Sequence, residues 1–139
     1  MTQVLSLNDT LMLKAFFNVI KNIKLPKNLV TDARKLNINP MLPVKDVKEL
    51  KNTLLDPSWR SVPMHFDVPS NSQIFGQIAQ AAGIEAILYP SKMSDKNHCL
   101  AVFPENLKNS TSFVEIEDSV PVLVKNKRLD SETYLALMT

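Results

Sequence analysis

The chain has 139 residues, of which 45% are hydrophobic, so it is long enough for one domain with a substantial core. Its formal net charge of +2 comes from scattered lysines, which excludes the concentrated basic stripe of a typical nucleic-acid binder. The single cysteine, Cys99, excludes an internal disulfide framework. No apolar run approaches the ~20 residues of a membrane span, and the N-terminus lacks a secretory signal. We therefore expect a cytoplasmic protein that binds neither nucleic acid nor a membrane.

The first half of the chain is predicted to be mainly helical. Gln3–Leu7 alternates in hydropathy and predicts a short strand, and Asn8–Thr10 supplies a turn with a helix cap. Apolar residues at helical spacing predict three helices, over Leu11–Ile23, Asn28–Leu36 and Val44–Leu55. The first of these helices is apolar over most of its surface, so we expect it to be covered on more than one side.

The second half contains most of the predicted strands. After the proline-rich segment Asp56–Pro69, a helix over Asn71–Ala82 is expected to begin at a Ser70 cap and to stop at Gly83. Its expected buried residues are Ile74, Phe75, Ile78 and Ala82. Two short apolar segments then lack hydropathy alternation, which predicts buried, adjacent, central strands. These segments are Ala86–Tyr89 and Cys99–Phe103.

Weaker patterns predict a peripheral strand, a last strand and a C-terminal helix, over Ser112–Glu117, Val120–Val124 and Ser131–Met138. Helices early and strands late in the chain predict an α+β fold, a small mixed sheet with packed helices.

The segment Tyr89-Pro90-Ser91 is the strongest candidate for a functional site. A proline at the end of a buried strand releases the next hydroxyl toward the polar loop Lys92–Asn97, a common arrangement at the rim of a pocket. We expect Ser91, Gln73 and Tyr89 to share one concave surface, with this loop as a mobile lip. Composition alone also allows a plain strand end followed by a polar turn.

Other chemistries find less support. His65, His98 and Cys99 lack the spacing of metal ligands, and Ser91 lacks the glycine-flanked elbow of a serine hydrolase. With two glycines in the whole chain, no glycine-rich phosphate loop can form. No metal site is therefore expected.

Several sequence blocks together resemble the RES domain, a bacterial family that degrades NAD. In chain order the blocks are Leu5–Asp9, Trp59-Arg60, Ser72–Gly76, Gly83–Ser91, and Cys99–Phe103 running into Pro104–Leu107. The resemblance spans about residues 3–118, and we treat residues 1–139 as a single RES-like domain. It implies a fold similar to the C-terminal portion of an ADP-ribosyltransferase-like domain. It also implies cleavage of the nicotinamide–ribose bond, with NAD as substrate and no resident cofactor.

The family is named for an arginine, a glutamate and a serine. Ser91 matches the serine, and the resemblance implies that Gln73, Tyr89 and Asn97 contact the substrate. The arginine and the glutamate belong to an N-terminal part of the domain, before the leading strand, which we expect to be absent. The arginines of this chain all follow that strand and do not match; they are Arg34, Arg60 and Arg128.

Three functions therefore stay open. The first is a RES-type toxin domain that degrades NAD and is incomplete, hence weakly active or inactive alone. The second is a non-catalytic remnant or subunit that acts as an interaction domain, and the third is a regulatory binding domain unrelated to the family. The expected partners are a cognate antitoxin, a complementing chain or a second copy, because a domain lacking a leading segment exposes apolar surface and strand edges.

Overall fold

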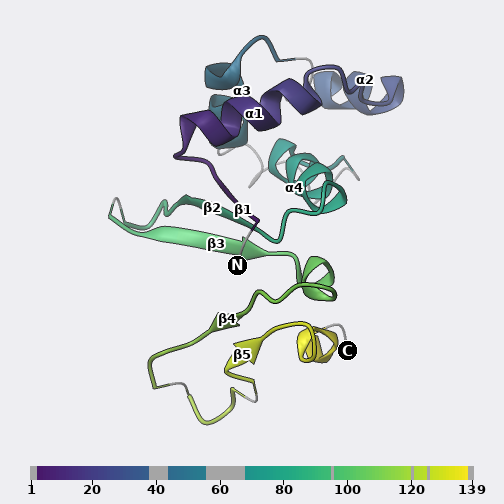
Figure 1. Ribbon diagram of the computed structural model, residues 1–139. Helices are drawn as coiled ribbons and strands as arrows, with labels where there is room; N and C mark the ends of the chain where they lie inside the picture. The colour runs from purple at the N-terminus through teal and green to yellow at the C-terminus, as the bar shows by residue number, and fades with distance from the viewer. Residues whose placement is uncertain are drawn as a thin grey trace. The chain divides into compact units, whose positions relative to one another are not determined.

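The computed structural model describes residues 3–37, 44–55, 68–94, 96–119, 121–124 and 126–137 (Figure 1). These residues form two compact units, Ser6–Ala79 and a second unit composed of Met1–Leu5 and Gln80–Thr139. Helices dominate the first unit and short strands the second, which confirms the predicted α+β class. The prediction of a single domain over residues 1–139 stays a prediction. None of the helices in the described ranges is long and apolar enough to span a bilayer.

The first unit contains the four α-helices of the described residues: α1 (Thr10–Ile20), α2 (Lys27–Lys35), α3 (Val47–Leu55) and most of α4 (Asn71–Ala81). Asp9 caps α1, because its carboxylate accepts hydrogen bonds from the backbone N–H groups of Leu11 and Met12 at 2.9 and 3.0 Å. The predicted cap is thus confirmed. The helix ends three residues before the predicted Ile23, which lies instead in a turn that leads to Pro26 at the start of α2.

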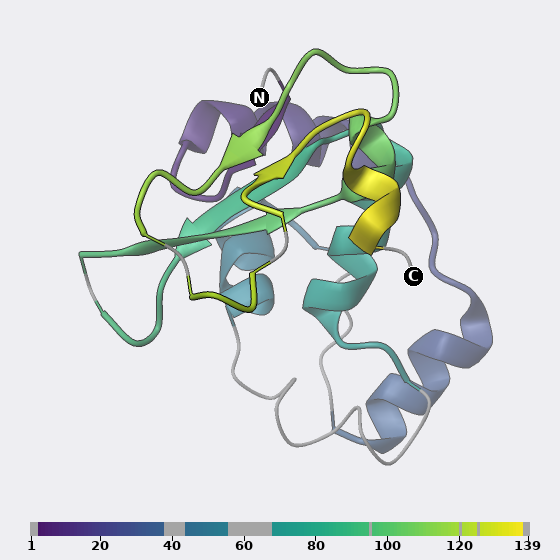
Figure 2. The same ribbon diagram turned by 90° about the horizontal axis from the view of Figure 1, so that it is seen from below.

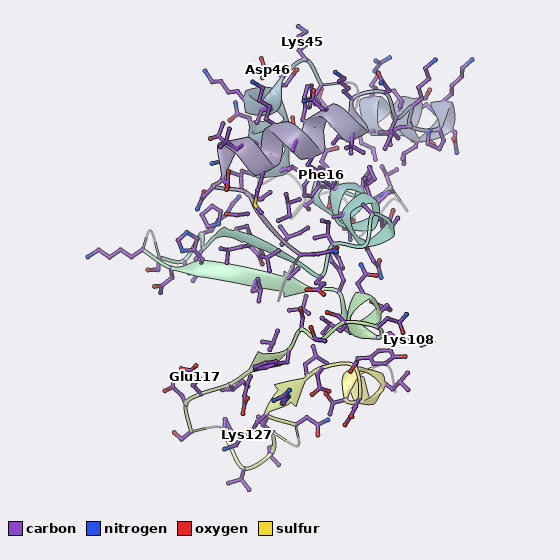
Figure 3. All side chains as sticks on the ribbon, viewed as in Figure 1. Phe16, Lys45, Asp46, Lys108, Glu117 and Lys127 are labelled. Atoms are coloured by element: carbon purple, nitrogen blue, oxygen red, sulfur yellow. The ribbon has the colours of Figure 1, made fainter. Side chains whose placement is uncertain are left out.

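The core of this unit lies where α1 packs against α3 and α4. Leu13, Phe16 and Ile20 are buried on one face of α1, and α3 contributes Leu50 and Leu54. Figure 3 shows the Phe16 side chain projecting from α1 toward α4. There it meets Phe75 edge to face, with ring centroids 5.2 Å apart, a favoured geometry for two aromatic rings.

Within the described residues α1 is covered on one side, and the expected cover on a second side stays a prediction. Leu11, Met12 and Val19 are exposed, so one face alone packs against other helices. The apolar pattern of a helix shows which faces could be buried, but a neighbour must supply the cover.

Side-chain hydrogen bonds cap the start of both α3 and α4. The Lys45 N–H donates to Glu49 Oε2 at 2.6 Å, and the Glu49 N–H donates to Asp46 Oδ1 at 2.8 Å, at the position labelled in Figure 3. Ser70 caps α4 as predicted. At its other end α4 stops at Ala81, and Gly83 adopts the predicted left-handed conformation with φ +79°. Ile74 and Phe75 are buried as predicted, whereas Ile78 is half-buried. Ala79 is buried in place of the predicted Ala82, because Ala82 lies past the last helical turn and is exposed.

The second unit is built on a three-stranded sheet in the order β1-β2-β3, formed by Val4–Ser6, Ala86–Pro90 and His98–Val102. Strands β2 and β3 are antiparallel neighbours, which confirms the predicted adjacency (Figure 2). The prediction that both are central and buried is wrong for β3, which occupies an edge of this sheet. The small and apolar residues of β3 are half-buried or exposed. Such residues can occupy either an edge strand or a central strand, so the sequence alone did not distinguish the two. Phe103, which follows β3, is half-buried.

A second, two-stranded sheet pairs β4 (Val114–Glu115) with β5 (Arg128–Leu129). Strand β4 lies inside the predicted peripheral strand. The predicted last strand is wrong, because residues 121–124 form a turn closed by the Val124 N–H and the carbonyl of Pro121 at 2.9 Å. The C-terminal helix is the short 3₁₀ helix η4 (Tyr134–Leu137), which packs against η3 (Pro104–Leu107) (Figure 2).

Arg128 holds the β4–β5 sheet together. Its guanidinium lies 4.1 Å from the ring centroid of Phe113, and its Nε donates to Asp130 Oδ2 at 2.7 Å. Asp130 also accepts hydrogen bonds from the backbone N–H groups of Glu132 and Thr133. The Arg128 bond, followed by these backbone bonds, lowers the pKa of Asp130 to about 2.

We predict that Phe75→Ala lowers the free energy of unfolding by about 3–5 kcal/mol, because it removes a buried ring and leaves a cavity beside Phe16. Urea unfolding followed by circular dichroism measures the loss. Leu11→Ala, at an exposed position of the same unit, is the control and should change stability by less than about 0.5 kcal/mol. Equal effects of the two substitutions would contradict the described core.

We predict that Asp130→Asn destabilises the protein at pH 7 and much less at pH 2. The folded pKa of about 2 lies below the usual value near 3.9. The stabilisation is therefore present above about pH 4 and is lost as the pH falls toward 2. Unfolding curves of both proteins across this range should converge at the acid end. A pH-independent difference would mean that the ionised carboxylate is not what stabilises this segment.

Candidate functional site

The end of the β2–β3 hairpin brings together three of the predicted site residues. Tyr89 pairs with Cys99 and Pro90 with His98, and Ser91 is the first residue after the strand. The Ser91 N–H then donates to the carbonyl of Asn97 at 2.9 Å, which closes the base of the loop. Ser91 and Asn97 therefore pair at the base of the loop that joins β2 to β3. Figure 2 shows this loop between the tip of the β2 arrow and the base of the β3 arrow.

The hydroxyl of Ser91 is half-buried and has one local partner. Its oxygen accepts a hydrogen bond from the Met93 N–H at 3.2 Å, so the chain turns immediately after the strand. A hydroxyl that accepts one such bond can still donate its own proton. Met93 and Asn97 are exposed, so the serine lies beside a solvated loop. The placement of Ser91 after Pro90 is as the sequence predicts, whereas mobility of the loop stays a prediction.

Tyr89 adds a second hydroxyl on the strand that leads to Ser91. Its pKa is raised, first by burial and then by the neighbouring Cys99 thiol. A raised pKa keeps the phenol neutral at physiological pH. Tyr89 can therefore donate a hydrogen bond but carries no charge.

Gln73 has a structural role in the helical unit. Its side-chain oxygen accepts from the Ser70 N–H at 2.8 Å, while the Gln73 N–H donates to Ser70 Oγ at 3.3 Å. This reciprocal pair is the capping box of α4. Ser91 belongs to the other compact unit, so the shared surface predicted for Gln73 and Ser91 stays a prediction.

Glu85, to which the sequence analysis gave no role, is buried at the start of β2. One carboxylate oxygen accepts from the Gln3 N–H at 3.3 Å, and the other accepts from the Ser110 hydroxyl. Its backbone N–H donates to the Gln3 carbonyl, and its carbonyl accepts from Phe103. The sequence does contain a sign of this role, because Glu85 is an acidic residue directly before an apolar strand.

Further charged groups lie elsewhere or outside the described residues. The Trp59-Arg60 pair and His65 fall outside the described ranges, while Arg34 is exposed on α2 and Arg128 is engaged by Asp130. Within those ranges, no three or more His, Cys, Asp or Glu side chains form a group that could hold a metal ion. At the hairpin end, Tyr89, Ser91 and Asn97 offer neutral hydroxyl and amide groups, and the loop between them also carries Lys92 and Lys96.

We predict that Glu85→Gln lowers the free energy of unfolding by about 1–3 kcal/mol, because an amide cannot accept hydrogen bonds at both positions. Glu105→Gln is the matched control. Glu105 is exposed and accepts one bond, from Gln80 at 3.0 Å, so its replacement should cost less than about 0.5 kcal/mol. If the two variants unfold at the same urea concentration, Glu85 is not a stabilising centre.

Comparison with known proteins agrees with the sequence blocks that end in Ser91. The family model described as the RES domain matches residues 17–124, most of the chain. No curated protein and no solved structure matches the chain. The match includes both strands of the hairpin and Ser91, and it excludes the hypothesis of a regulatory domain unrelated to this family. The chain belongs to the RES domain family.

Proposed function

We propose that this chain is the serine-bearing part of a RES-type domain that cleaves NAD at the nicotinamide–ribose bond, and that the 139 residues alone have little or no activity. The observation that carries the proposal is the position of Ser91, half-buried at the mouth of the β2–β3 hairpin and inside the family match. Such a hydroxyl can donate to a ribose oxygen or to the carboxamide of nicotinamide.

The reaction requires charges as well as hydrogen bonds. When the bond between C1 of the ribose and the nicotinamide nitrogen breaks, nicotinamide leaves with the bonding pair, and a water or phosphate oxygen takes its place. The ribose acquires oxocarbenium character, which a carboxylate stabilises, while an arginine suits the diphosphate. Ser91, Tyr89 and Asn97 are neutral and provide neither group.

Two charged side chains in the same unit as Ser91 have structural partners. Glu85 accepts bonds from Gln3 and Ser110, and Arg128 is held by Asp130 and the ring of Phe113. Taking either into the reaction would break these contacts. We therefore propose that the family's arginine and glutamate come from another segment or chain, with Ser91, Tyr89, Asn97 and Gln73 contributing contacts to NAD.

This assignment places the chain among cytoplasmic toxins that deplete NAD, paired with an antitoxin. The alternative is a non-catalytic subunit or interaction domain. The structural partners of Glu85 and Arg128 favour this alternative as well. A domain that only binds another protein does not require an arginine or a glutamate that is available for catalysis.

Release of nicotinamide, followed by chromatography, tests the proposal. We predict that the 139-residue chain with NAD and phosphate releases no more nicotinamide than buffer does. With a longer chain or a second chain that carries the family's arginine and glutamate, cleavage should appear. Ser91→Ala should then reduce the rate by ~10²–10³-fold, because it removes a positioned donor at a charged transition state.

Ser94→Ala, in the same loop, is the matched control and should leave the rate unchanged. Rapid NAD loss from the 139 residues alone would contradict the assignment, since one of the chain's own arginines would then serve the diphosphate. Absence of cleavage in the complemented system would leave the interaction domain as the function.

A further inference from the structure

Helix α1 presents a second apolar face, which the helical unit leaves open to solvent. Leu11, Ala15 and Val19 follow one another at intervals of four residues, and Met12 lies beside them. The side chains of Leu11 and Val19 are 79% and 70% exposed, whereas Ile20 on the packed face is 0% exposed. An apolar face of this kind on a soluble unit marks an interaction site.

The shape of this face favours another helix as its occupant. Residues four apart form a ridge along a helix, and such ridges pack into the grooves of a second helix. Helices that lie on membranes usually present aromatic side chains on their apolar face, and the ridge formed by Leu11, Met12, Ala15 and Val19 contains none. The exposed ridge of α1 is aliphatic and narrow, with Leu11 and Val19 at its most exposed positions.

The lysines near the ridge indicate that its partner is acidic. Between Asp9 and Asp32 the only charged residues are lysines, Lys14, Lys21, Lys24 and Lys27. Asp9 is occupied with the N-terminus of α1, and Lys21 bonds the neutral Asn18 at 3.3 Å. Two copies of α1 packed face to face would bring lysine against lysine, which is unfavourable. Asp and Glu on a partner would instead be attracted.

We propose that this face of α1 (Leu11, Met12, Ala15 and Val19, with Lys14 and Lys21 at its margin) binds a helical segment of a different protein, one with an aliphatic ridge and acidic flanks. Burial of the two ridges supplies affinity, and the lysines set orientation and exclude a second copy. Ser91 and the hairpin belong to the other compact unit, so this proposal rests on none of the residues of the candidate site.

A synthetic helical peptide of about 18 residues, roughly five turns, tests this directly. It carries leucines at helical ridge spacing and glutamates on both flanks, and binding is measured by fluorescence anisotropy. We predict that Val19→Glu weakens binding about tenfold or more, as expected for a charge placed in a buried apolar contact. Lys14→Glu with Lys21→Glu should weaken it about three- to tenfold and abolish its dependence on salt. Leu123→Gln, at an equally exposed apolar position of the other unit, should change nothing.

Circular dichroism shows whether each variant is folded, and because both sites are exposed, folding should be preserved. The proposal is overturned if a scrambled peptide, or one with lysines in place of the glutamates, binds as well. It is also overturned if vesicles of phosphatidylcholine and phosphatidylglycerol bind through Val19 while the peptide does not. A dimer in sedimentation that Val19→Glu converts to a monomer would make a second copy the occupant.

Discussion

The buried carboxylate of Glu85 is the constraint on which the strand unit depends. A buried charge is tolerated only when its oxygens are hydrogen-bonded, and here the donors come from Gln3 near the start of the chain and Ser110 after η3. The backbone of the same residue joins Gln3 on one side and Phe103 on the other. One side chain thus fixes where β2 begins and holds its neighbours in place.

From that fixed point the register of the hairpin determines the candidate site. Ala86 lies opposite Val102 and Pro90 opposite His98, so Ser91 must emerge where the strands part. A slip of one residue would move every side chain of β2 to the other face of the sheet. The position of the serine is therefore set six residues upstream, at Glu85.

The features that the sequence predicted correctly are those that neighbouring residues decide. The Asp9 cap, the left-handed Gly83 and the end of β2 at Pro90 each depend on a few adjacent residues. Some errors concern local detail, such as the exact end of α1 and the turn over residues 121–124, and others concern distant partners. Whether β3 lies at an edge, and whether α1 is covered, depends on elements far along the chain. The role of Glu85 likewise requires Ser110, which periodicity cannot reveal.

Helix α1 and Glu85 each depart from the usual rule that apolar side chains are buried and charged side chains are exposed. In a well-folded domain the apolar pattern and the burial agree, and disagreement often marks a functional surface. On α1 an apolar ridge is exposed, which indicates a missing neighbour, whereas Glu85 is a charge buried with partners, which indicates a structural role. Glu85 is therefore the wrong carboxylate to assign to catalysis, although it lies six residues from Ser91. The ridge on α1 and the serine on the hairpin can instead be changed separately, so the two proposals can be tested by different substitutions.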